Sequence, residues 1–299
     1  MAQYVTYDQV GIKEDVSDII SNITPTKTPF QSSIGSEKAM QTLFQWQEDT
    51  LRAEAANAKV EGATAVDSTR VATTMRSNYT QILSDTIKVS ATNDAVSTYG
   101  RAKESAYQMA KTAAELKRDL EYAYVGIGTN AAVAGSSTVA REMASAFTMI
   151  DSTMRTFTGG TSTKVDEADV LVMAQAVYDE GAEPEILMVT PTNSLEIADF
   201  AAVSGTRIRE LSGTDRKVVN VVDVYVSPFG AVKVVLNRFM KAKYTLMYSP
   251  DMWKKVVLRN WTRETLAKTG DNTSMLLVGE FSLKHKNFLA SAWCEEAAS

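Results

Sequence analysis

Apolar side chains recur at intervals of three or four residues between residues 92 and 125, which is the period of an amphipathic helix. This stripe consists of Val96, Tyr99, Ala102, Ala106, Met109, Ala113, Leu116, Leu120 and Tyr124. Thr92 or Asn93 can cap the start of such a helix, and Gly126 follows its end. The pattern therefore predicts one helix over residues 94–125, a rod about 48 Å long at a rise of about 1.5 Å per residue.

Two alternating stretches, residues 40–46 and 79–89, predict β-strands on either side of a segment with few bulky side chains. Six of the sixteen residues in that segment, 51–66, are alanine. Such a sequence buries too little area to offset the entropy lost when it becomes ordered. The pattern predicts a projecting ribbon, whose tip gains order by lying on another subunit.

Residues 165–240 carry the signals of a separate compact unit. Asp166 can cap a first helix, and Gly181 ends it. The inward stripe of this helix is Val170, Ala174 and Val177. The apolar run EILMV that follows predicts a buried strand.

A second helix in this unit is predicted to start at residues 191–193, where Asn193 and Glu196 have the spacing of a capping box. Its expected inward residues are Leu195, Ala198 and Val203. Two β-rich runs then flank the sequence SPFG, which is a hairpin signal. No pair of carboxylates in the unit stands out as the acid and base of a catalytic site.

The two ends of the chain differ in character. Residues 1–36 are polar, and their prolines disfavour helix, so we expect an arm that lies across something else. Residues 241–299 are rich in strand signals, and their last long run, 274–294, predicts one strand. Residues 1–50 carry three basic and seven acidic side chains, whereas residues 241–299 carry nine basic and six acidic ones. The two ends therefore have opposite net charge and can attract one another weakly across subunits.

The residue types available limit the chemistry. Cys294 is the single cysteine and His285 the single histidine, which excludes an internal disulfide and leaves too few ligands for a usual zinc site. A Cys/His catalytic pair would have to use these two residues, and packing explains both more simply. The turn TFTGGTSTK lacks the spacing of a phosphate-binding loop. We expect no catalytic residue, no metal and no cofactor.

The charge and hydropathy of the chain narrow the class of protein. The formal net charge of −5 is opposite in sign to the basic footprint of a nucleic-acid reader. No run approaches the roughly 18 consecutive apolar residues of a membrane span, and the first residues lack a signal-peptide pattern. We therefore expect a soluble protein that is made in a cytosol and does not bind a membrane. Its 299 residues are expected to divide into two domains.

Several segments, in the same order along nearly the whole chain, resemble the major capsid proteins of tailed bacteriophages. They are ISNITPTKTPFQSSIG, WQEDTLRAEAANAKVEG, SNYTQILSDTIKVSAT, ELKRDLE, RETLAKTGD and VGEFSLKHKN. The resemblance implies an α+β, HK97-like capsid fold with an N-terminal arm, an extended β-hairpin loop (E-loop), a peripheral domain on a long spine helix, and an axial domain. The corresponding ranges are 1–38 for the arm, 39–90 for the E-loop with its strands, 91–150 and 241–299 for the peripheral domain, and 151–240 for the axial domain.

The resemblance also implies a function. Many copies would form hexamers and pentamers that tile the icosahedral head of a virion around double-stranded DNA, assembled in the host cytoplasm with scaffolding, portal and cement proteins as further partners. The expected contact residues at the E-loop tip are Ala53, Glu54, Ala56, Asn57, Lys59, Glu61 and Gly62. Those expected in the axial loops are Arg207, Arg209, Asp215 and Arg216. Some relatives cross-link Lys to Asn, and the tip contains both residue types.

Two other functions remain open at this point. An encapsulin-like compartment would share the fold and enclose protein cargo in place of DNA, so the nucleic acid content of purified shells separates the two. A soluble oligomeric enzyme would instead form a small assembly and contain a pocket with converging polar groups.

Overall fold

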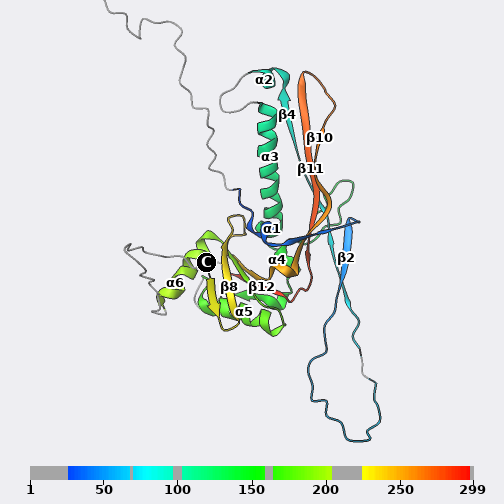
Figure 1. Cartoon of the computed structure of the whole chain (residues 1–299), viewed down its shortest axis with the longest axis vertical. Helices are drawn as coiled ribbons and strands as arrows, with labels where there is room; N and C mark the ends of the chain where they lie inside the picture. The colour runs from blue at the N-terminus through cyan, green and yellow to red at the C-terminus, as the bar shows by residue number, and fades with distance from the viewer. Residues whose placement is uncertain (1–25, 68–69, 97–102, 159–163, 204–223, 297–299) are drawn as a thin grey trace, which may run out of the picture.

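The computed structural model describes residues 26–67, 70–96, 103–158, 164–203 and 224–296. In these parts the chain forms two sheets, a two-stranded ribbon that projects from the body, and helices packed on the sheets (Figure 1). The long helix α3 (Glu104–Glu121) and the long hairpin of strands β10 and β11 run side by side at one end of the body, and the ribbon extends toward the other end.

The four-stranded sheet has the order β1-β10-β11-β4. Its strands are β1 (Gly35–Lys38), β10 (Trp253–Thr265), β11 (Asn272–His285) and β4 (Gln81–Ser90). β10, β11 and β4 pair antiparallel, whereas the short β1 runs parallel to β10 at the edge. The alternation predicted for residues 79–89 holds from Leu83 onward, where Leu83, Ile87 and Val89 are at least partly buried while Ser84, Thr86 and Lys88 are exposed. It fails at Thr80, which is fully buried and separates two strands.

The long helix that packs against β4 is shorter than the apolar stripe predicts. A five-residue helix, α2 (Ala91–Ala95), ends before it, and α3 itself spans Glu104–Glu121, followed by a π-helical turn, η2 (Tyr122–Gly126). The prediction of one helix from residue 94 is therefore wrong at its start.

The helix caps explain this break. Ser90, not Thr92 or Asn93, caps α2 by accepting from the Asn93 N–H, and the chain has turned out of helix at Lys103. The Asp94 carboxylate accepts from both the N–H and the hydroxyl of Ser105 in the first turn of α3. These hydrogen bonds lower the pKa of Asp94, and they satisfy a free donor of α3 that a residue inside one continuous helix could not reach.

The six-stranded sheet has the order β5-β12-β9-β6-β8-β7. Its strands are β5 (Arg155–Phe157), β12 (Ser291–Glu295), β9 (Tyr244–Tyr248), β6 (Ile186–Val189), β8 (Gly230–Leu236) and β7 (Val224–Ser227). β9 and β12 thus come from the segment assigned above to the peripheral domain, and the domain ranges stay a prediction. The single strand predicted over residues 274–294 is wrong, because β11 and β12 belong to different sheets and a turn after His285 separates them.

Helices α5 (Glu167–Asp179) and α6 (Pro191–Val203) belong to the same region as this sheet. The prediction that Asp166 caps α5 is confirmed, and Asp169 completes a capping box with it. The predicted inward residues Val170, Ala174 and Val177 are fully buried. The hairpin predicted around SPFG is confirmed as β7–β8. Short elements complete the fold: α1 (Pro29–Ser33), α4 (Ala146–Met149), and the 3₁₀ turns η3 (Ser152–Met154) and η4 (Pro250–Met252).

Two predictions for α6 are wrong. Its first N–H groups are capped by Thr190, whose hydroxyl accepts from the Asn193 N–H, so Asn193 is not the cap. The Asn193 side chain instead lies in the core and donates to the Thr245 hydroxyl. Leu195 is 64% exposed and faces outward, while Ile197 and Ala198 are buried.

Candidate assembly interface

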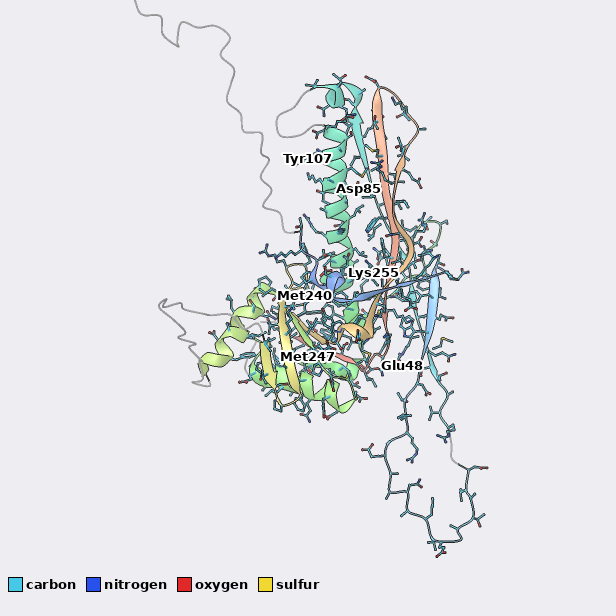
Figure 2. All side chains as sticks on the ribbon, viewed as in Figure 1. Glu48, Asp85, Tyr107, Met240, Met247 and Lys255 are labelled. Carbon is cyan, nitrogen blue, oxygen red and sulfur yellow. The ribbon has the colours of Figure 1, made fainter. Side chains whose placement is uncertain are left out.

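The ribbon consists of β2 (Leu43–Glu48), β3 (Thr74–Tyr79) and the loop between them, residues 49–73, which we call the ribbon loop. Every described residue of this loop is exposed, and Figure 2 shows its side chains standing clear of the rest of the molecule. The predicted tip residues all lie there: Ala53, Glu54, Ala56, Asn57, Lys59, Glu61 and Gly62. A projecting ribbon is therefore confirmed, but its second strand is β3 and not the predicted stretch 79–89, most of which forms β4 of the four-stranded sheet. Contact of the tip with another subunit stays a prediction.

A tight turn reverses the chain within this tip. The Ala63 N–H donates to the Val60 carbonyl at 3.0 Å, and Gly62 has a φ of +78°. A Cβ added at Gly62 would meet no atom within 4 Å. A positive φ at the third residue of a turn favours glycine because it carries no Cβ. Gly62 thus serves the turn, and the turn brings no side chain from another part of the chain to the tip.

Apolar side chains in the ribbon loop have no packing partner among the described residues of the molecule. Leu51 is 98% exposed, and Val60, Val66 and Val71 are each more than 80% exposed. Single exposed apolar residues are normal on a protein surface, but these four lie on one loop that has no hydrophobic core of its own. Such a loop loses conformational entropy without gaining burial, so it is suited to pack against another chain.

The root of the ribbon, in contrast, is held firmly to the body. The buried Glu48 carboxylate accepts from Arg76 Nε at 2.6 Å and from the Phe288 backbone N–H at 2.9 Å. The Arg76 guanidinium also lies 4.2 Å from the centre of the Phe288 ring. These contacts fix the direction in which β2 and β3 leave the molecule.

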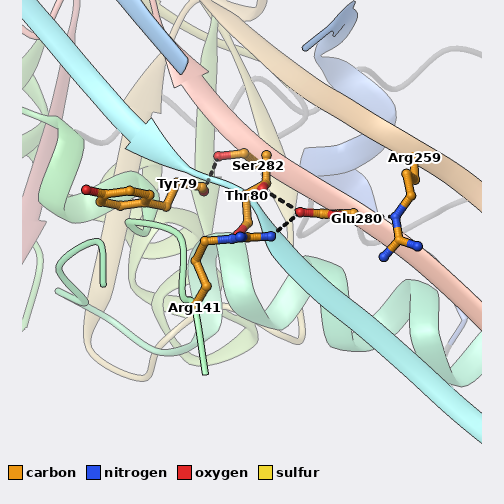
Figure 3. A network of polar contacts seen from close by, with 6 residues as sticks. All are labelled: Tyr79, Thr80, Arg141, Arg259, Glu280 and Ser282. Atoms are coloured by element: carbon orange, nitrogen blue, oxygen red, sulfur yellow. Dashed lines mark hydrogen bonds and ion pairs between the residues drawn. The ribbon is translucent and has the colours of Figure 1, made fainter. Parts of the chain in front are cut away.

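A second network anchors the chain where β3 passes into β4 (Figure 3). The buried Glu280 carboxylate of β11 accepts from the Thr80 hydroxyl at 2.7 Å and forms ion pairs with Arg141 and Arg259. Arg141 also donates through Nε to the Thr80 carbonyl, while the Ser282 hydroxyl donates to the Tyr79 carbonyl. One carboxylate therefore ties together the ribbon, β11 and the loop that carries Arg141.

The described part of the arm is fixed by a buried carboxylate at the end of α3. Glu121 accepts from the backbone N–H groups of Phe30 and Gln31 and from the Asn237 side-chain amide, at 2.7 to 2.9 Å. Burial raises the pKa of Glu121 despite these three donors. The Phe30 ring packs against Tyr124, Tyr248 and Trp253, so α1 is both hydrogen-bonded and packed at this point.

The single histidine forms part of the core. His285 stacks on Trp253 with ring centres 3.9 Å apart and lies within hydrogen-bond distance of the Met149 carbonyl and the Ser291 hydroxyl. Ser291 and His285 are both fully buried, so no substrate can reach this Ser–His pair. Burial lowers the pKa of His285 to about 3 and raises the pKa of the buried Cys294 to about 12, which keeps both uncharged at neutral pH.

The residues expected in the axial loops, Arg207, Arg209, Asp215 and Arg216, lie outside the described residues. Within the described ranges, no cluster of three or more His, Cys, Asp or Glu side chains could hold a metal ion. In the same ranges no helix has the length and hydropathy needed to span a membrane.

Sequence reasoning missed the three buried carboxylates at the anchor points, Glu48, Glu121 and Glu280. Their partners lie 21 to 240 residues away along the chain, so local patterns do not reveal them. Glu280 did leave one signal, since it stands alone inside the apolar run LLVGEFSL. An isolated charge in a buried strand indicates a paired group, because an unpaired charge is costly to bury.

Comparisons with known proteins point to one kind of assembly. A family model described as SU10 major capsid protein matches residues 2–298. The chain is 31% identical over 335 residues to the major capsid protein of Escherichia phage Phieco32, covering 96% of this chain and 95% of that one.

Solved structures share the fold at low identity. The capsid structure of Cyanophage P-SCSP1u matches with a TM-score of 0.65 and 12% identity over 97% of this chain and 94% of that chain. The encapsulin complex of Synechococcus elongatus matches with a TM-score of 0.64 and 10% identity over 99% of this chain and 96% of that chain.

Proposed function

The chain belongs to the SU10 major capsid protein family, and from this premise we propose that its copies form hexamers and pentamers that close into the icosahedral head of a tailed phage around double-stranded DNA. The expected α+β, HK97-like fold is confirmed by the solved capsid structures that match it. As a major capsid protein the chain is a structural component of a virion, builds a shell from copies of itself, and is not an enzyme. The alternative of a soluble oligomeric enzyme is therefore rejected.

The ribbon loop is the observation that best supports the proposed assembly. It joins a firmly anchored root to a fully exposed tip, and its apolar side chains find no partner within one molecule. Contacts between different surfaces of identical chains close into rings or shells when the rotation between copies allows it. Each such contact can bury a modest area, because stability is shared among many copies.

Other parts of the proposal follow from the family. The tip, Ala53 to Gly62, contacts a neighbouring subunit, where alanine-rich backbone can approach closely. The segment that contains Arg207, Arg209, Asp215 and Arg216 supplies loops near the centre of each hexamer or pentamer. Scaffolding, portal and cement proteins are further partners, assembly takes place in the host cytoplasm, and the DNA is held without sequence-specific binding.

Removal of the ribbon loop tests the proposal. Residues 51–66 are replaced by a short Gly-Ser linker, which leaves Glu48, Arg76 and the root intact, and the product is compared with the wild-type chain by electron microscopy and sedimentation. A matched control replaces Arg52 and Arg70 with Gln, because both are exposed in the ribbon loop and lie outside the tip, so this changes charge without removing the loop or its expected contact residues. We expect shells from the wild type and the control, and folded small oligomers from the deletion; closed shells from the deletion would reject the role of the loop.

The encapsulin-like alternative shares the fold, and its 10% identity to this chain shows the fold alone. The contents of the particle distinguish the two functions. We expect particles from infected cells to contain double-stranded DNA, detected by nuclease-protected absorbance at 260 nm. Protein cargo without nucleic acid would favour the compartment.

A further inference from the structure

Five basic side chains lie around the end of α3, where α1 and the turn that follows β8, residues 237–241, meet this helix. We call them the basic face: Lys117 and Arg118 of α3, Arg238 and Lys241 of the turn, and Lys255 of β10. The Gln31 side chain donates to the Lys117 carbonyl at 3.0 Å, which places α1 beside Lys117. Segments far apart in the sequence therefore bring positive charge to one end of α3.

The turn after β8 is held at the same place. The Arg118 guanidinium lies 6.0 Å from the centre of the Phe239 ring. The Lys241 N–H donates to the Val125 carbonyl, in the π-helical turn that continues α3, at 2.9 Å. The cations of the turn and those of the helix thus belong to one surface region.

Two of these charges are close enough to affect one another. Burial and the nearby Lys117 ammonium lower the pKa of Lys255, and Figure 2 labels Lys255 beside the end of α3. Like charges held close together raise the energy of the folded chain. An anion bound beside both of them removes this cost.

None of the five cations forms an ion pair within the part of the chain that the structure describes. The buried Nε of Arg118 also lacks a hydrogen-bond partner there. The dipole of α3 favours a cation in its last turn, which accounts for Arg118 but not for the cations on other elements. The basic face therefore presents positive charge that a negatively charged partner can neutralise.

The carboxylates of α3 lie on another side of the helix. A helix turns about 100° per residue, so Asp119 points roughly opposite to Lys117. Burial and the carboxylates of Glu115 and Asp85 raise the pKa of Asp119, which places it toward β4. Glu115 itself pairs with Lys111 at 3.8 Å. Acidic and basic charges are thus separated around α3.

Double-stranded DNA matches the charge of the basic face. It carries one negative charge per about 1.7 Å of its axis, and Lys and Arg side chains bind its phosphates without reading sequence. The chain as a whole has a formal net charge of −5 and repels DNA, so contact with DNA requires a local basic surface. We propose that the basic face binds the phosphate backbone of the enclosed double-stranded DNA.

This inference rests on the proposed function and adds the surface that faces the DNA. It also orients the subunit in the shell: α1, the end of α3 and the turn after β8 lie on the inner side, whereas Asp85 and Asp119 lie farther from the DNA. Because Glu121 joins both α1 and the turn to α3 by hydrogen bonds, the five cations keep their arrangement as the shell closes.

Neutral substitutions on dispersed subunits test the inference. The test variant carries Lys117→Gln, Arg238→Gln and Lys255→Gln. A matched control with the same change of net charge carries Lys88→Gln, Lys233→Gln and Lys268→Gln, three exposed lysines on other surfaces. Circular dichroism and thermal melting check that both variants fold, and fluorescence anisotropy measures their affinity for a labelled random-sequence duplex over a range of salt concentrations.

We expect the test variant to bind at least tenfold more weakly than the wild type and the control to change affinity less than twofold. The slope of log affinity against log salt concentration should fall by about 2 to 3 in the test variant, because each lost phosphate contact contributes about 0.9. If the test variant does not fold, the exposed Lys117→Gln is compared with Lys88→Gln, with an expected difference of about threefold. Equal binding by the folded test and control variants would overturn the inference.

Cross-linking in filled particles identifies the surface that touches DNA. Particles from infected cells are irradiated with ultraviolet light, digested with nuclease and protease, and searched by mass spectrometry for nucleotide adducts. We expect adducts on peptides from residues 111–121, 237–241 and 254–258. Adducts confined to other segments would overturn the inference.

A carbodiimide, which joins amines to carboxylates, tests an acidic protein segment as the other kind of partner. If it links Lys117 or Lys255 to a carboxylate of another chain in filled particles, and no nucleotide adduct forms there, the basic face is a protein contact and the inference fails. Particles without DNA would reject the proposed function, whereas the anisotropy comparison would still decide what the basic face binds.

Discussion

The carboxylate of Glu121, at the end of α3, accepts a hydrogen bond from the backbone N–H of Phe30, 91 residues earlier in the chain, at 2.8 Å. A second oxygen of the same carboxylate accepts from the Gln31 N–H at 2.9 Å. These N–H groups belong to the first turn of α1, which has no side-chain cap of its own. The long helix thus provides the cap of the short one, and the arm enters the body at a fixed point.

Removing this cap should release the arm. Glu121→Ala leaves the N–H groups of Phe30 and Gln31 without an acceptor and leaves the Asn237 amide only the Met188 sulfur, and an unsatisfied buried donor costs about 1–3 kcal/mol. We expect the free energy of unfolding of dispersed subunits to fall by about 3 kcal/mol, measured by urea denaturation. Trypsin should also cleave faster at Lys27. Glu115→Ala on the same helix is the control, because Glu115 is exposed and its pair with Lys111 contributes about 0.5 kcal/mol or less.

His285 should make stability depend on pH. Its pKa is about 3 in the folded state and 6.5 in the unfolded chain, so between these values only the unfolded chain binds the proton. The contribution of the neutral imidazole is therefore complete above pH 6.5 and is lost as pH falls toward 3. From pH 7 to pH 5 the loss is about 2 kcal/mol at 1.36 kcal/mol per pH unit.

Comparison with a variant isolates this effect from the many carboxylates of the chain. The difference in unfolding free energy between the wild type and His285→Gln should shrink by about 2 kcal/mol between pH 7 and pH 5. A difference that stays constant, or widens on acidification, would contradict the assignment of His285 as a buried neutral group.

The two arginines on Glu280 should differ in their effect on stability. The Arg141 side chain is 22% exposed and also donates to the Thr80 carbonyl, whereas that of Arg259 is 54% exposed and makes one ion pair. We expect Arg141→Ala to cost about 2 kcal/mol and Arg259→Ala less than about 1 kcal/mol in thermal or urea unfolding. Equal losses would mean that the shared ion pair, and not burial, sets the contribution of each arginine.

Two glycines should respond differently to alanine. A Cβ on Gly126 would lie 2.5 Å from the Phe239 carbonyl oxygen and closer still to the Tyr122 ring, so Gly126→Ala must shift backbone at the end of the π-helical turn. A Cβ added at Gly181 would meet no atom within 4 Å, so the cost of Gly181→Ala comes only from the φ of +84° at this residue. We expect losses of about 3 kcal/mol for Gly126→Ala and about 1 kcal/mol for Gly181→Ala in calorimetry. A larger loss at position 181 would reverse this order and reject the packing argument.

Some elements were predictable because the signal is local. Asp166 stands directly before the helical pattern, so its role as the cap can be read from the sequence, and it caps α5 as expected. The ribbon loop was predictable for a different reason: its alanines offer too little apolar area to pack, and all of its described residues are exposed.

Other features depend on contacts that no local pattern contains. Helical periodicity continues through Asp94 and Val96, yet the chain leaves the helix there, because Asp94 is used to cap α3 at Ser105. Periodicity reports which residues can share a helix face and carries no information about where a side chain finds a better partner. The candidate interface shows the same division, since the exposed loop follows from composition while the Glu280 network behind it joins Thr80, Arg141 and Arg259 from three distant segments.

The strand order of the larger sheet constrains when the protein can fold during synthesis. β12 lies between β5 and β9, although it comes 134 residues after the end of β5. A strand position filled so late leaves β5 without its partner and one edge of β9 open until residue 295 has left the ribosome, and pairing across such sequence distances is slow. Nascent chains therefore cannot complete this sheet early, which delays any contact between subunits that needs the finished sheet.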